Sequence, residues 1–155
     1  MSHSVHPYSH RLGIIRDWKS RWFSSGQKYK DFLRADMMLR EFLEKKMRGQ
    51  YIGSIEMERN DKMFRLIVKT SRPGVVIGRS GEGSVKLRKD IMKFATKNKL
   101  AIPADFKLDV EEIKSPESNA AIVGQMIAEG LEKRMPFRRV MKLSLIHISE
   151  PTRPY

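Results

Sequence analysis

The sequence predicts an α+β domain in which a three-stranded sheet packs against helices, preceded by a basic extension. Segments with apolar residues three or four positions apart, typical of helices, are interspersed with segments in which apolar and polar residues alternate, typical of half-buried strands. Hydrophobic residues make up 40% of the 155 residues, enough for a core, and the net charge is +13. A chain of this length suits one ordinary domain with extensions.

The charge balance of 31 Lys and Arg against 18 Asp and Glu points to a polyanionic partner, and nucleic acid is the first expectation. No long apolar run or signal-like segment is seen, so we expect no membrane insertion and no secretion. The sequence contains no cysteine, which excludes disulfides and cysteine zinc sites and suits a reducing cytosol.

Isolated acidic residues do not suggest catalysis. Glu111 and Glu112 are adjacent, so a strand would point them to opposite faces, and Glu56 with Glu58 indicates a solvated charged strand face. The serines have no recognisable histidine and carboxylate partners, and the N-terminal histidines match no metal-ligand spacing. We therefore expect no enzyme activity, no cofactor and no metal.

Residues 1–30 form the basic extension. They combine cations with aromatic side chains, which suits RNA because cations meet phosphates while rings stack on bases. A disordered basic tail with some aromatics docked on the body is the alternative. The candidate RNA contacts are His6, Tyr8, Arg11, Arg16, Trp18, Lys19, Arg21 and Trp22.

The first helix is expected from Asp31, a capping residue type, and Gly49 is placed to end it. Alternation over residues 54–58 and 64–71 then predicts two strands of a hairpin.

After the hairpin, Pro73 and Gly74 lead into a short apolar segment, 75–77, and then into a glycine loop that opens a second helix with an apolar stripe from Leu87 to Ala95. Alternation over 106–111 predicts the third strand. Ser115 followed by Pro116 is typical of a helix start, and Pro136 interrupts that last helix, after which residues 137–142 can begin another.

The glycine loop consists of Gly78, Arg79, Ser80 and Gly81. Glycines at the opening of a helix allow a ligand to approach the backbone, and the helix offers free N–H groups suited to phosphate. Arg79 adds a charged donor, and Arg72, Lys86 and Lys89 can extend the positive rim. The spacing alone is weak evidence, because a connecting turn has the same pattern, while the P-loop and dinucleotide-binding patterns are absent.

Residues 70–75 with 77–82 resemble the type II KH domain. Three further segments, residues 6–22, 87–89 and 132–139, make the match more specific. With them, the chain is more closely similar to the small-subunit ribosomal protein S-three family, from about His6 to Lys142. The resemblance implies a type II KH domain over 31–135 after the rRNA-binding extension 1–30. It further implies a structural constituent of the head of the small ribosomal subunit, in the cytoplasm, with rRNA and neighbouring head proteins as partners.

In that family, the basic cluster matching Arg138, Arg139 and Lys142 lies beside the channel through which mRNA enters, so mRNA is a further expected partner. Residues 136–142 would begin a second domain. Residues 143–155 depart from the family and look like translated adapter sequence, so we expect an artefactual tail on a truncated chain, with a divergent terminus as the alternative. Ser80 stands where many members carry a second charge, which weakens the expected phosphate contact of the loop.

Two other functions remain open at this level. One is a free-standing KH module that acts on mRNA or small RNA, and the other is a basic domain that binds a membrane surface or a protein partner. The block His6–Trp22 favours the ribosomal reading over the free-standing module. A steep salt dependence of RNA binding would separate the two RNA-binding functions from the domain that binds a membrane or a protein.

Overall fold

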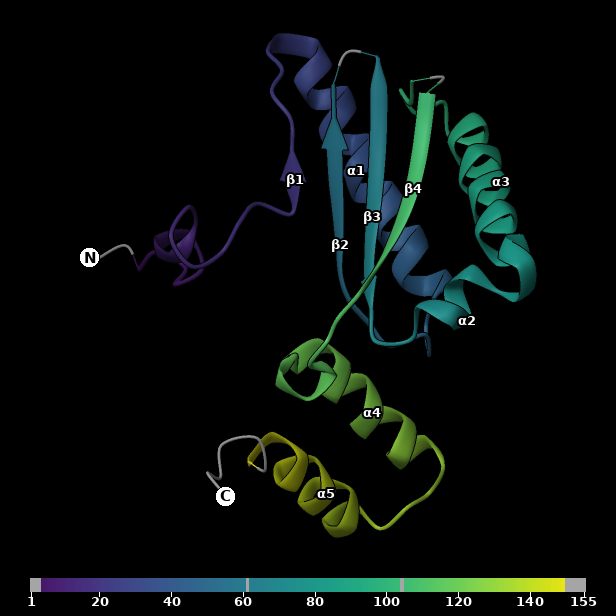
Figure 1. Ribbon diagram of the computed structural model, residues 1–155. Helices are drawn as coiled ribbons and strands as arrows, with labels where there is room; N and C mark the ends of the chain where they lie inside the picture. Colours follow the sequence, from purple (N-terminus) through teal and green to yellow (C-terminus); the bar gives the residue numbers. More distant parts are fainter. Residues whose placement is uncertain (1–3, 61, 104, 150–155) are drawn as a thin grey trace.

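The computed structural model describes residues 4–60, 62–103 and 105–149 (Figure 1). The end of the expected artefactual tail, residues 150–155, and the first three residues of the expected extension therefore lie outside the described residues. In chain order the elements are a 3-10 helix (Ser9–Arg11), β1 (Ser20–Arg21), α1 (Gly26–Lys46), β2 (Ile52–Arg59), β3 (Met63–Thr70), α2 (Pro73–Ile77), a 3-10 turn (Arg79–Gly81), α3 (Glu82–Lys97), β4 (Asp105–Glu112), a 3-10 turn (Pro116–Ser118), α4 (Ala120–Glu132) and α5 (Phe137–Ser149).

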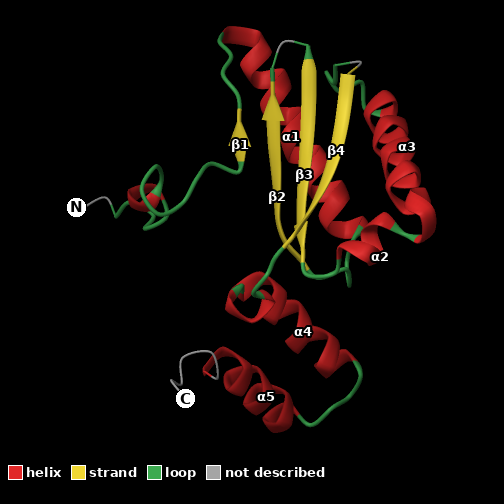
Figure 2. Ribbon diagram, viewed as in Figure 1, coloured by secondary structure: helices red, strands yellow, loops and turns green. Residues whose placement is uncertain are grey.

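The sheet has the strand order β1-β2-β3-β4. β2 and β3 form an antiparallel hairpin with Met57 opposite Leu66, whereas β3 and β4 are parallel with Phe64 opposite Phe106. Parallel neighbours need a crossover, which α2 and α3 provide. α1 and α3 both cover one face of the sheet, and the other face is left open (Figure 2).

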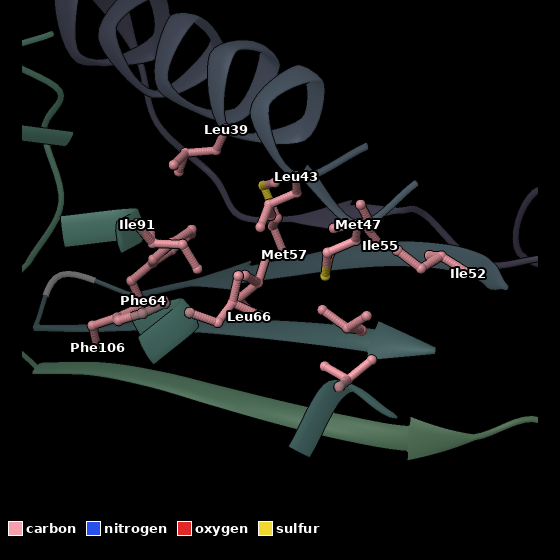
Figure 3. Close-up of a cluster of buried hydrophobic side chains, with 13 residues drawn as sticks. Leu39, Leu43, Met47, Ile52, Ile55, Met57, Phe64, Leu66, Ile91 and Phe106 are labelled. Carbon is pink, nitrogen blue, oxygen red and sulfur yellow. The ribbon is translucent and has the colours of Figure 1, made fainter. Parts of the chain in front are cut away.

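The core lies between that covered face and the two helices. The apolar residues that alternate along β2 and β3 meet the stripes of α1 and α3, and their side chains point into one cluster (Figure 3). Phe64 and Phe106 stack at a centroid distance of 5.6 Å, and both are buried. The predicted strand faces are therefore confirmed for Leu66, Val68 and Phe106, all of which are buried.

The α+β class and the predicted order of helix, hairpin, short helix, glycine loop, helix, strand and helix are confirmed. The strand count was wrong, because the two-residue strand β1 pairs with β2. Two residues are too few to show an alternating pattern. These two residues are recognised as a strand only from their pairing with β2.

Two predicted helix starts were also wrong. α1 begins at Gly26 rather than Asp31, after the extended residue Ser25. α4 begins at Ala120, where the side chain of Asn119 accepts a hydrogen bond from the backbone N–H of Ala121 at 3.0 Å. The Ser115-Pro116 pair instead opens the separate 3-10 turn Pro116–Ser118.

α4 and α5 form a helical hairpin below the sheet in Figure 1. Val140 is buried against Gly130, where an added methyl group would lie 3.1 Å from it. α5 continues without a break past Lys142 to Ser149, so the boundary expected at residue 143 does not coincide with the end of a helix. Among the described residues, no helix is both long and apolar enough to span a bilayer.

Candidate nucleic-acid interface

The glycine loop joins α2 to α3 through three residues with positive φ. Gly78 has φ +73°, Ser80 has φ +53° with ψ +22°, and Gly81 has φ +82°. Only Ser80 carries a side chain in this region, and a small polar residue tolerates it better than a branched one. Arg79 and Ser80 are exposed at the tip of the loop, where a ligand can reach them.

The glycines around this loop serve different purposes. A methyl group on Gly78 would lie 2.9 Å from the backbone nitrogen of Gly83, and one on Gly83 would lie 2.6 Å from the carbonyl oxygen of Val76. These two glycines therefore let α2 and α3 pack backbone to backbone. A methyl group on Gly81 would meet only Ser84 Oγ, at an ordinary contact distance of 3.9 Å, so Gly81 is the glycine that leaves the loop accessible.

The N-terminus of α3 opens at this accessible glycine. No side chain caps it, and the Ser84 hydroxyl donates to the Gly81 carbonyl oxygen at 2.7 Å. Uncapped backbone N–H groups and the positive end of the helix dipole favour an anion here, whereas the carboxylate of Glu82 in the first turn opposes one. The start of α3 is therefore only moderately favourable to an anion.

The three rim residues do not share one environment. Lys86 and Lys89 are exposed on α3, beyond the loop. The guanidinium of Arg72 instead lies 4.5 Å from the ring centre of Tyr51, whose hydroxyl donates to Glu129 on α4. That hydrogen bond raises the pKa of Tyr51. Arg72 thus borders the junction with α4 as well as the start of α2.

The N-terminal candidates divide into docked and exposed residues. The indole N–H of Trp22 donates to Asp36 Oδ2 at 2.7 Å. The centre of its ring lies 5.4 Å from the ring centre of Tyr29 and 5.7 Å from that of Phe32, both on α1. Trp22 therefore docks on the body. Arg16 lies over the ring of Tyr8 at 5.3 Å. The exposed members of the group are His6, Arg11, Arg16, Trp18 and Lys19.

Arg21 already has carboxylate partners inside the chain. It pairs with Glu58 at 2.7 Å, with Glu56 at 3.0 Å and with Asp17 at 3.0 Å. The hydrogen bond that Arg21 donates to Glu58 is the main reason that the pKa of Arg21 is raised. These carboxylates neutralise the positive charge of Arg21, which is therefore less available to an RNA phosphate.

The open face of the sheet continues this network. Lys69 pairs with Glu56 at 2.5 Å, and Arg65 pairs with Asp109 and, at 3.3 Å, with Glu58. Glu56 and Glu58 thus belong to a charged strand face, as predicted, and not to a catalytic pair. With cations and carboxylates in balance, this face offers little attraction to a polyanion, and the excess positive charge lies elsewhere.

The predicted RNA contacts lie on three separate surfaces. The extension adjoins β1 at one edge of the sheet, while the glycine loop and α3 lie toward the β4 edge (Figure 1). Arg138, Arg139 and Lys142 are exposed on α5, with the Arg138 guanidinium 5.8 Å from the ring centre of Phe137. The structure does not gather these residues into one site.

The sequence patterns did not predict the buried ion pair between Arg59 and Asp36. Arg59 Nη2 lies 2.9 Å from Asp36 Oδ1, and the two side chains are 1% and 5% exposed. A signal was available, because Arg59 follows Ile55 and Met57 on the inward side of its strand. A charge at an inward position usually has a buried partner.

Comparison with known proteins agrees with this geometry. The model of the KH domain family matches residues 38–118, just over half of the chain. This chain belongs to the KH domain family. The matched KH domain runs from the second half of α1 through β2, β3, the glycine loop and β4, so it includes the loop described above.

The similarity to curated relatives extends beyond the KH domain. The small ribosomal subunit protein uS3 of Xanthomonas euvesicatoria pv. vesicatoria (strain 85-10) is 41% identical over 145 residues, which cover 94% of this chain and 57% of that relative. Its namesake from Caldicellulosiruptor saccharolyticus is 40% identical over 94% of this chain and 63% of its own length. The predicted similarity to this ribosomal family is confirmed, and the chain spans about three fifths of these relatives.

Proposed function

We propose that this chain is a structural, non-catalytic constituent of the small ribosomal subunit that binds rRNA and acts in the cytoplasmic ribosome. The observation that carries the proposal is the exposed Gly78–Gly81 loop at the uncapped start of α3, in a KH domain whose chain carries a charge of +13. The similarity to uS3 along 94% of the chain supports the ribosomal setting.

In this proposal, a phosphate approaches the open side of Gly81, where N–H groups of the first turn of α3 and the Arg79 side chain are available. Arg79 is the single cation of the loop, so the loop supplies one contact among several. The exposed cations of the extension and of α3 supply the others. Affinity for RNA then depends strongly on salt, because each phosphate contact releases counterions.

Replacing Ser80 with aspartate is expected to weaken binding to small-subunit rRNA by about tenfold, because a carboxylate would face the incoming phosphate. Ser80 suits this test because it is exposed and because aspartate tolerates its left-handed backbone. The dissociation constant would be measured by fluorescence anisotropy at fixed salt.

Ser80→Asn is the matched control, since asparagine has nearly the same shape without the charge. Gly78→Asp is a poor probe, because its side chain would collide with the backbone of Gly83. If the aspartate and asparagine variants bind rRNA equally well, the loop does not contact phosphate.

We further propose that Arg138, Arg139 and Lys142 lie beside the path of mRNA into the subunit. Their exposure on one helix, away from the glycine loop, supports a role separate from rRNA anchoring.

Replacing Arg138 and Arg139 with glutamine is therefore expected to slow translation of structured mRNA severalfold while incorporation into subunits changes less than twofold, because the two losses concern different RNA contacts. Translation of a hairpin-containing mRNA and sedimentation of assembled subunits would be compared. Equal loss in both assays would contradict the separation.

The neighbouring head proteins expected as partners also belong to this proposal. A free-standing KH module remains the alternative. The similarity to uS3 covers 145 residues, well beyond the KH domain itself, and so favours the ribosomal assignment.

A further inference from the structure

α3 presents a row of lysines on its outer side. Lys86, Lys89, Lys93 and Lys97 follow one another at spacings of three or four residues, and all four are exposed. Residues so spaced lie on one side of a helix, and this row extends for about 16 Å along the axis. It begins one turn after the glycine loop and continues to the last residue of α3.

These lysines form no ion pair with a carboxylate among the described residues. Of the two acids of α3, Glu82 is exposed in the first turn, and Asp90 is paired with Lys46 of α1. The hydrogen bond from Lys46 is the main reason that the pKa of Asp90 is lowered, and the charges of Lys93 and Lys86 lower it further. By contrast, Arg21, Arg65 and Lys69 on the open sheet face all pair with carboxylates. Charge is thus balanced on the sheet and left unbalanced along α3.

Among the described residues of α3, no aromatic side chain lies on the side of the lysines. Phe94, the aromatic residue of α3, turns inward and stacks on Phe42 of α1 at 4.4 Å with an interplanar angle of 15°. The exposed side chains beside the lysines are the aliphatic Val85 and Met92, together with Arg88 and Thr96. Single-stranded RNA is usually held by rings that stack on its bases, whereas double-helical RNA is recognised through phosphates and ribose hydroxyls.

We infer that the outer side of α3 binds the backbone of double-helical RNA through Lys86, Lys89, Lys93 and Lys97. Regular spacing of cations along a straight helix suits the regular phosphates of a duplex strand, and aliphatic side chains between them suit contact with ribose. The inference rests on the proposed RNA-binding function and names the RNA class. It extends the contact surface from the loop to the far end of α3.

The test variant is Lys93→Gln with Lys97→Gln, which lies at the end of α3 away from the loop and leaves it intact. The matched control is Lys107→Gln with Lys114→Gln. Both control lysines are exposed, lie on or just after β4 and have no carboxylate partner among the described residues, so the loss of charge is identical. Full-length chains would be titrated with a fully paired RNA hairpin and with an unpaired oligonucleotide.

The test variant is expected to lose roughly tenfold in affinity for the hairpin, and its plot of log K against log salt should flatten by about one to two units. Its affinity for the unpaired oligonucleotide and both affinities of the control variant should change less than twofold. If the first variant lowers the melting temperature, Lys89→Gln with Lys93→Gln replaces it.

The outcomes separate the two proposals. If the unaltered chain binds neither RNA, the proposed function itself fails. If it binds the hairpin but the α3 and control variants behave alike, α3 is not the binding surface and the inference is overturned while the proposed function stands. Equal loss on both RNAs would overturn the assignment to double-helical RNA.

Discussion

Replacing Arg59 with methionine is expected to lower the free energy of unfolding by about 3–5 kcal/mol. Methionine approximates the length of the arginine stem but cannot neutralise Asp36. The carboxylate of Asp36, which is 5% exposed, would then remain buried beside an apolar side chain. Removing one partner of a buried pair leaves an uncompensated charge, and that cost exceeds the small gain from burying methionine.

The surroundings of Arg59 increase this cost. Its guanidinium donates to the Ala101 carbonyl oxygen at 2.5 Å and lies 4.4 and 4.6 Å from the ring centres of Phe32 and Phe64. Burial lowers the pKa of Arg59, and the nearby charge of Asp36 raises it, which helps keep the group protonated. The cluster joins α1, β2 and the connector before β4, so its loss affects the whole domain.

The matched background is Asp36→Asn, which removes the charge yet retains an oxygen for the indole N–H of Trp22. In that background, Arg59→Met should cost at least 2 kcal/mol less than in the unaltered chain, as a double-mutant cycle would reveal. Both costs would be measured by urea denaturation followed by circular dichroism. If Arg59→Met costs the same in both backgrounds, the ion pair is not the source of the loss.

Replacing Gly83 with alanine is expected to destabilise the chain by roughly 1–3 kcal/mol. Alanine is normally favoured over glycine within a helix by about 1 kcal/mol, so propensity alone predicts the opposite sign. At Gly83, however, the added methyl group would lie 2.6 Å from the Val76 carbonyl oxygen and 2.8 Å from that of Ile77. Both atoms belong to the backbone of α2, so α2 must shift away from α3.

Gly124→Ala provides the matched comparison. Gly124 lies within α4, and an added methyl group there meets no heavy atom within 4 Å. The same substitution should therefore stabilise the chain by about 0.5–1 kcal/mol. Thermal and urea unfolding of both variants would check the opposite signs. A stabilising Gly83→Ala would show that α2 and α3 have room to separate.

Local pattern was sufficient for much of the fold. The alternation in β2, β3 and β4 and the helical stripes of α1 and α3 predicted the faces that form the core, because each periodicity reflects the geometry of one element. The Gly78–Gly81 loop was likewise found from its spacing and from the helix that follows it. Both features are encoded within a few adjacent residues.

Local pattern could not reveal contacts with distant partners, and the RNA contacts expected of those residues stay predictions. Trp22 was expected to contact RNA, and the structure docks it on Asp36, 14 residues away. Arg21 was expected to do the same, and it is held by Glu56 and Glu58 on a neighbouring strand. None of these partners can be chosen from spacing. The pairing of β1 with β2 places Arg21 beside Glu56 and Glu58, and the contact of Trp22 with α1 places it beside Asp36.

The sequence by itself determined the class of the domain, the order of its main elements and the identity of the glycine loop. The tertiary structure decided which glycines keep α2 against α3 and which leaves the loop open, because that depends on backbone atoms across the contact. It also decided which cations are neutralised and which remain free. Charge composition counts both alike, whereas binding to a polyanion depends on where the unpaired cations lie.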